Sequence, residues 1–244
     1  MNINIYPLLI SFLAGISTLI GIIPTYLKIN SNKLINFSLA FSAGIMTSIS
    51  IFSLIPESFK YLNYNIFIEI PIIIIEIFLG IYLSKCIDIF INNKESNHLK
   101  KVNLITIIAL VLHNIPEGII TYLTTSTNFK LGLLLAIGIS LHNIPEGLAI
   151  AIPMYFVTKN HKKVFFYTLV SGFSELLGAL LAALFLTNLI STQLLSLLLA
   201  ITSGIMLFVS LEELLKTALE EKNKYTYAFF TIGLIIMYII SKII

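Results

Sequence analysis

One hexapeptide, His-Asn-Ile-Pro-Glu-Gly, occurs twice in this chain, at residues 113–118 and again at residues 142–147. Each copy offers an imidazole, a side-chain amide and a carboxylate, and each lies within a long apolar stretch, at residues 102–125 and 131–157. Ionisable side chains are costly inside a bilayer and mark ion pathways or ligand sites when they occur there. The repeat therefore indicates a functional site among apolar helices.

The spacing of the hexapeptide suits a metal ion. On an α-helix its histidine, asparagine and glutamate share one face. The proline lacks an N–H and frees a backbone carbonyl one turn earlier, near Leu112 and Leu141. Without any thiolate, this donor set suits zinc, iron, manganese, cobalt, nickel and cadmium. Two such faces would bring together His113, Asn114, Glu117, His142, Asn143 and Glu146.

These side chains have an alternative role, because amides, imidazoles and carboxylates also hold membrane helices together by hydrogen bonds. Two identical copies in neighbouring apolar segments favour the metal site. A further carboxylate, Glu175, lies mid-segment in Ser-Gly-Phe-Ser-Glu-Leu-Leu-Gly, at residues 171–178. Small residues allow close helix approach, so we expect Glu175 to face the bundle interior as another metal ligand.

The composition predicts a polytopic membrane protein. The chain has 244 residues, of which 57% are hydrophobic and 11% charged, against about 25% charged in soluble domains. The expected partners are the lipid bilayer and a metal ion, with no nucleic acid. The one cysteine, Cys86, excludes an intrachain disulfide, and we expect it to pack as a small apolar group. The N-terminus lacks a basic region and a small-residue cleavage site, so we expect the first apolar segment to be retained.

Eight apolar segments are each near the roughly 20 residues that a bilayer requires. Their short connections predict one all-α transmembrane domain, residues 1–244, with antiparallel neighbours. The segments are residues 5–27, 34–59, 66–90, 102–125, 131–157, 164–188, 194–219 and 225–243.

Lysine placement predicts the orientation. All 15 basic residues are lysine. With the N-terminus outside, only Lys60, Lys130 and Lys242 fall on the outer side, and the other lysines, Lys28 among them, fall inside. Cytoplasmic loops carry the excess of basic residues, so this asymmetry predicts eight spans with both termini outside.

Two pairs of segments indicate inverted repeats. The fourth and fifth segments carry the hexapeptide, and the second and seventh carry similar stretches at residues 42–46 and 202–206. The members of each pair cross the membrane in opposite directions, which is the pattern of inverted repeats around a midplane site.

Four other acidic residues have roles that the sequence does not decide. Glu57 is either an ion-uptake carboxylate near the outer face or a solvated residue at a helix end. Glu76 lines a path or pairs with another helix. Glu212 and Glu213 close the apolar run of the seventh segment.

Taken together, these motifs resemble the ZIP (Zrt/Irt-like) divalent-metal transporters, and among them the bacterial ZupT-like branch. The resemblance rests on the paired hexapeptides, on Ser-Gly-x-x-Glu-x-x-Gly in the sixth segment and on Gly-Ile-Met with Ser-Leu-Glu-Glu-Leu in the seventh. It implies a 3+2+3 helix arrangement, a homodimer in the plasma membrane, and an elevator-like motion that moves metal into the cytoplasm.

The resemblance also implies a binuclear centre. One site would use His113, Glu117, His142 and Glu146, and the other Asn114, Asn143 and Glu175, with Glu117 and Glu146 bridging. Two departures are visible. Ser53 stands where the branch often has histidine, so an outer relay ligand is expected to be missing. His98 is the one histidine in a loop that is often histidine-rich, which argues against metal sensing there.

Two functions from other classes compete with transport. A membrane-embedded zinc hydrolase would activate water on a fixed ion, with Glu175 as a base, although His-Glu-x-x-His is absent. A metal sensor would bind the ion and move none. Zinc is the favoured substrate, and iron, manganese, cobalt and cadmium also suit the ligands.

Overall fold

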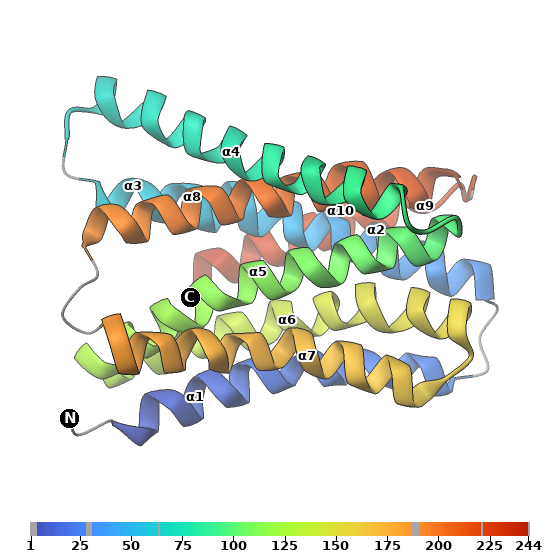
Figure 1. The fold of residues 1–244 in the computed structure, drawn as a ribbon, viewed down its shortest axis with the longest axis horizontal. Coiled ribbons are helices and arrows are strands. Elements are labelled where there is room, and N and C mark those ends of the chain that lie inside the picture. Colours follow the sequence, from blue (N-terminus) through green and yellow to red (C-terminus); the bar gives the residue numbers. More distant parts are fainter. Residues whose placement is uncertain (1–3, 28–30, 63, 187–190, 221, 244) are drawn as a thin grey trace.

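The computed structural model (Figure 1) describes residues 4–27, 31–62, 64–186, 191–220 and 222–243. Within these ranges the chain is almost entirely helical and has no β-strand. Eight of the described helices are long and apolar enough to cross a membrane, which confirms the predicted fold class. They cover Ile5–Tyr26, Asn32–Tyr61, Ile66–Asn92, His98–Thr127, Phe129–Thr158, His161–Phe185, Thr192–Glu220 and Thr226–Ile243. The predicted end of the sixth segment at residue 188, like Lys28, lies outside the described residues.

Four spans are single α-helices and four change helix type along their length. The single helices are α4 (Ile66–Asn92), α5 (His98–Thr127), α6 (Phe129–Thr158) and α10 (Thr226–Ile243). The composite spans are α1 (Ile5–Ile16) with the 3₁₀ segment η1 (Ser17–Tyr26); α2 (Ser31–Ile49) with the π segment η2 (Ser50–Leu54) and α3 (Ile55–Tyr61); α7 (His161–Leu181) with the π segment η3 (Ala182–Leu186); and α8 (Thr192–Phe208) with the π segment η4 (Val209–Leu215) and α9 (Lys216–Glu220).

Asparagine side chains fix the starts of the two helices that carry the hexapeptide. The Asn97 side chain accepts a hydrogen bond of 2.9 Å from the Lys100 N–H, and Asn128 accepts one of 3.2 Å from the Leu131 N–H. These caps satisfy N–H groups that a helix start leaves unpaired. Although α5 and α6 contain internal prolines, both are continuous helices through the hexapeptide.

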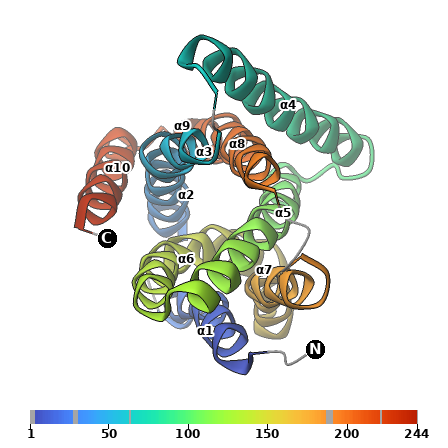
Figure 2. The same cartoon turned by 90° about the vertical axis from the view of Figure 1, so that its left-hand side faces the viewer.

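The spans form two groups, which Figure 2 shows end on. α5, α6 and α7 pack with one another and with α1 and η1, and we call these four spans the ligand bundle. The spans that contain α2, α4, α8 and α10 form the second group, the support bundle. Because α2 packs on α6 and α8 packs on α5, the two groups meet along the helices that carry the hexapeptide.

Close helix contacts in the support bundle follow the predicted inverted repeat. Gly44 of α2 lies against the Phe230 carbonyl of α10, and Gly204 of α8 lies against the Ile77 carbonyl of α4. A Cβ at either glycine would overlap that carbonyl. The contact between the second and eighth spans therefore has the same form as the contact between the seventh and third spans. The second and seventh spans run in opposite directions, as expected for an inverted repeat.

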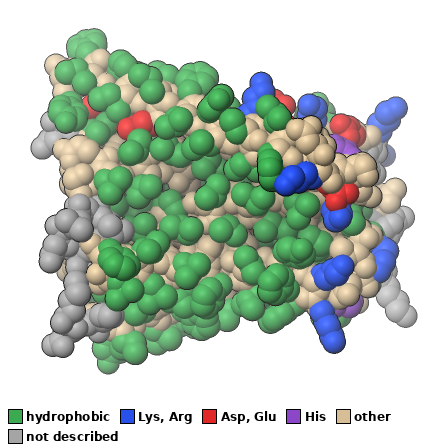
Figure 3. Space-filling model, viewed as in Figure 1, with side chains coloured by type: hydrophobic (Ala, Val, Ile, Leu, Met, Phe, Trp, Pro, Cys, Tyr) green, Lys and Arg blue, Asp and Glu red, His purple; other side chains and the backbone are tan. Residues whose placement is uncertain are grey.

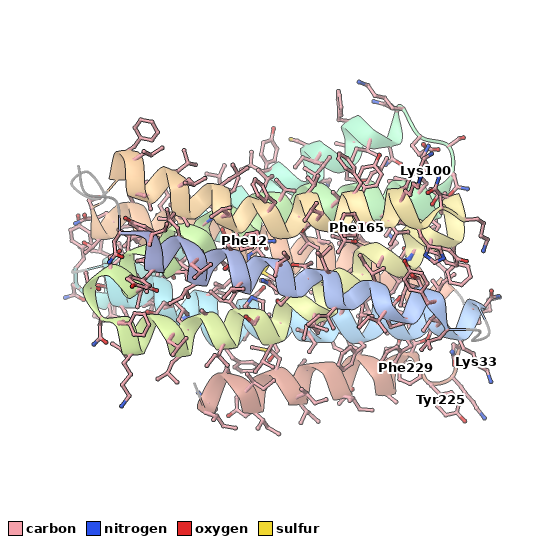
Figure 4. All side chains as sticks on the ribbon, turned by 90° about the horizontal axis from the view of Figure 1, so that it is seen from below. Phe12, Lys33, Lys100, Phe165, Tyr225 and Phe229 are labelled. Atoms are coloured by element: carbon pink, nitrogen blue, oxygen red, sulfur yellow. The ribbon has the colours of Figure 1, made fainter. Side chains whose placement is uncertain are left out.

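The surface separates apolar and basic side chains. Hydrophobic side chains cover the middle of the face in Figure 3, while lysines gather at one end. Figure 4 places Lys33 and Lys100 at this end, which we call the basic end. Here Lys100 donates a hydrogen bond to Glu95 and, with the Asn97 N–H, lowers the pKa of that partly buried carboxyl. The end-to-end asymmetry fits the lysine pattern, and the direction across the membrane stays a prediction.

The prediction for Cys86 needs correction. Its side chain is exposed on α4 rather than packed between helices. α4 contacts its neighbour α8 through a narrow strip that includes Gly80, so most of its apolar surface is left for lipid.

Candidate metal centre

All seven predicted ligands lie deep within the ligand bundle. α5 carries three of them, α6 carries three, and α7 carries Glu175, and no member of the set is more than 5% exposed. Apolar residues flank each ligand along its helix, so the long hydrophobic segments set the depth of the polar groups.

The two imidazoles and two of the carboxylates are in mutual contact. His113 Nε2 lies 3.3 Å from both Glu117 Oε1 and Glu146 Oε1. His142 Nε2 lies 3.2 Å from Glu117 Oε1, so Glu117 is shared by both imidazoles. Ligand atoms of His113, His142 and Glu146 all lie within 4.8 Å of one another. Two zinc–ligand bonds of about 2 Å each reach across about 4 Å, so small movements would let these groups share one ion.

Backbone carbonyls hold the two asparagine amides in matching orientations. Asn114 Nδ2 donates to the Ser171 carbonyl of α7 at 2.8 Å, and Asn143 Nδ2 donates to the Ala14 carbonyl of α1 at 3.0 Å. An amide has one donor end and one acceptor end, so each carbonyl fixes which end points away from it. Oδ1 of both residues is buried without a hydrogen-bond partner, which leaves two amide oxygens for a ligand.

Glu175 joins the cluster through Asn143. Its Oε2 accepts a 3.0 Å hydrogen bond from Asn143 Nδ2, while its Oε1 is buried without a partner. Glu117 and Glu146 lie within electrostatic reach of it. Neither oxygen of Glu146 accepts a hydrogen bond with good geometry. Buried oxygens without partners cost free energy, and a bound cation would satisfy all of these atoms together.

The glycine that ends each hexapeptide allows a neighbouring helix to approach. Gly118 lies against the Glu175 carbonyl of α7, and Gly147 lies against the Thr18 carbonyl of η1. A Cβ at either position would overlap the carbonyl. These contacts bring α7 close to α5 and the first span close to α6, and so place Glu175 and the amide-binding carbonyls at the cluster.

Two groups that position the site were not found from the sequence. The anchoring carbonyls of Ala14 and Ser171 are backbone atoms, which no side-chain pattern reveals. Ser42 of α2 donates a 2.6 Å hydrogen bond to the Pro145 carbonyl inside the second hexapeptide, and so links the two bundles. The similarity of residues 42–46 to residues 202–206 marked this stretch without indicating that contact.

The other acidic candidates lie outside the cluster. Glu57 pairs with Lys60 at 2.6 Å at a partly exposed position, and Glu212 pairs with Lys216 at 3.7 Å at an exposed one. Glu76 has one buried oxygen without a partner on α4. Glu213 is buried in η4, within electrostatic reach of Asp88.

Comparison with known proteins gives one family. The sequence profile of the family described as ZIP Zinc transporter matches residues 92–241. The zinc transporter ZupT of Chlorobium phaeovibrioides is 37% identical over 238 residues, covering 89% of this chain and 90% of the relative. The proteins of the same name from Clostridium perfringens and Campylobacter jejuni are 32% and 35% identical, with 89% and 86% of this chain covered and 88% and 86% of theirs.

Proposed function

The chain belongs to the ZIP zinc transporter family, and from this premise we propose that it moves zinc into the cytoplasm through the centre between α5, α6 and α7. As a family member it is a multi-pass protein of the inner membrane that transports divalent metal ions and is not an enzyme. This sets aside the zinc-hydrolase hypothesis.

The observation that carries the proposal is the set of buried ligand atoms without partners. Carboxylate, imidazole and amide atoms from both hexapeptides converge midway along α5 and α6, and several have no hydrogen bond. If these groups only held the helices together, their acceptors would be paired, as buried polar groups in folded proteins nearly always are. The unpaired set favours a centre that is completed by its transported ion.

We assign the ligands to two neighbouring ions. His113, His142 and the two hexapeptide glutamates would hold one, and the asparagine oxygens with Glu175 would hold the other. The contact of Glu117 with both imidazoles, and the hydrogen bond from Asn143 to Glu175, support this division. Glu117 and Glu146 would bridge the two ions.

The mechanism is alternating access with the ligand bundle as the moving part. All seven ligands and both anchoring carbonyls belong to that bundle, so it can shift against the support bundle without dismantling the centre. A dication neutralises buried carboxylates that are costly to carry through the bilayer, which favours movement of the loaded state. A homodimer, as the family resemblance implies, is part of the proposal.

The test is metal flux into proteoliposomes that contain the purified protein and a metal-sensitive dye. Zinc should enter. The relative rates at which iron, manganese, cobalt and cadmium enter would rank the preference of the centre among these metals. Binding without flux, as in a metal sensor, would refute the transport mechanism. Glu95→Ala is the matched control, because this acidic residue is paired to Lys100 outside the centre.

A further inference from the structure

Asn103 lies on the ligand-bearing face of α5, nearer to the basic end than the centre. It precedes Asn114 by 11 residues, which is about three helical turns and about 16 Å along the axis. The Asn103 side chain is 1% exposed. The buried side chains of Ile107 and Leu110 lie between Asn103 and the centre along the same helix. Asn103 is therefore not part of the metal centre.

The hydrogen bonding of Asn103 repeats that of the asparagines in the centre. Asn103 Nδ2 donates to the Ile150 carbonyl of α6 at 2.8 Å, and Oδ1 is buried without a partner. A helix-joining role explains the nitrogen but leaves the oxygen unexplained, because an unpaired buried acceptor is destabilising. The same arrangement at Asn114 presents an oxygen to the metal centre.

The inverted repeat provides an internal comparison. On α6, the residue 11 positions before Asn143 is Gly132, which has no side chain and lies against Thr125 of α5. α5 and α6 are therefore in direct contact at the end of this helix pair that lies away from the basic end. The equivalent position on α5, which lies nearer the basic end, is occupied by Asn103, and its amide oxygen has no hydrogen-bond partner. If close packing of α5 and α6 were the only requirement, glycine would suit position 103 as well as position 132.

We propose that Asn103 Oδ1 is a transient ligand for the metal ion after it leaves the centre and before it reaches the cytoplasm. The proposal rests on the function proposed above. A single neutral amide oxygen binds a divalent ion weakly compared with the carboxylates and imidazoles of the centre. Such a ligand replaces part of the hydration shell in an apolar passage without holding the ion there.

Replacing the oxygen by sulfur tests whether the ion touches this position. In a Cys86→Ser background, Asn103→Cys should raise the ratio of cadmium to zinc transport at least about threefold, because thiolates favour softer ions. Thr106→Cys is the control: this residue is also fully buried on α5, and its hydroxyl donates to the Val102 carbonyl of its own helix at 2.8 Å. Its ratio should equal that of the background protein, and equilibrium zinc binding should be unchanged in both variants.

An unchanged ratio in an Asn103→Cys protein that transports normally would overturn the proposal and leave Asn103 as a helix-joining residue. If the cysteine variant does not fold, Asn103→His keeps an N–H donor for Ile150 and replaces oxygen by nitrogen. It should shift transport from manganese toward zinc, and a ratio equal to wild type would again contradict the proposal. Failure of the metal centre itself would be seen differently, as full transport by Glu117→Ala.

Discussion

The orientation of each asparagine amide decides what it can offer to a metal ion. Carbonyls of α7 and α1 occupy the donor ends of Asn114 and Asn143, so the oxygen ends are left for the centre. The hexapeptide predicts that an amide lies beside the histidine and glutamate, but it does not indicate which end is free. That information comes from the backbone of other helices.

Glu117 should be the most sensitive ligand, because it contacts both imidazoles and would serve both ions. Glu117→Ala should lower zinc uptake more than about 100-fold, which corresponds to about 2.7 kcal/mol. Uptake is measured in cells at matched membrane levels, with Glu95→Ala as the control. Wild-type uptake by Glu117→Ala would be incompatible with the binuclear centre.

Asn114 should have a milder and more selective effect, since it would contact one ion only. Asn114→Ala removes one neutral oxygen and should reduce zinc transport by about tenfold or less while changing the order of preference among zinc, manganese and cadmium. Competition between metals in proteoliposomes measures that order. A uniform loss for all metals would instead indicate that Asn114 only holds α7 through the Ser171 carbonyl.

At the level of elements, hydrophobic length and lysine placement predicted the eight spans and their order. The changes of helix type were not predicted, because 3₁₀ and π segments depend on which carbonyls and side chains pack around a turn. Asn103 was not identified as a site from the sequence, because an asparagine near a helix start resembles any polar residue at a membrane edge. Its buried, unpaired oxygen is visible only when α6 is packed beside it.

The approach of α7 to α5 should depend on Gly118. Gly118→Ala would place a Cβ against the Glu175 carbonyl, and such overpacking costs about 1–3 kcal/mol. We expect a lower melting temperature of the purified protein and weaker zinc binding, because Glu175 moves away from the cluster. Ile108→Ala, on the exposed side of α5, is the control. Unchanged zinc binding in Gly118→Ala would show that the centre does not require this contact.

For the whole molecule, the basic end should face the cytoplasm. In a Cys86→Ser background, Ser96→Cys and Lys162→Cys occupy exposed positions there and should resist an impermeant thiol reagent added to intact cells. Thr127→Cys, at the exposed last residue of α5, should react readily. The opposite labelling pattern would reverse the predicted orientation and the direction of transport.

Movement between the bundles should be sensitive to the hydrogen bond from Ser42 to the Pro145 carbonyl, which crosses their interface beside the centre. A net contribution of about 0.5–1.5 kcal/mol means that Ser42→Ala should shift the balance between conformations by about two- to tenfold. The shift should change the zinc turnover rate, and it should change the labelling rate of a cysteine placed along the interface. Ser11→Ala is the control, because the Ser11 hydroxyl bonds to the Pro7 carbonyl within its own helix. Because equilibrium binding draws on ligands in one bundle only, the intrinsic affinity of the centre should change little in Ser42→Ala. Equal turnover and equal labelling in both variants would contradict a mechanism in which the ligand bundle moves against α2.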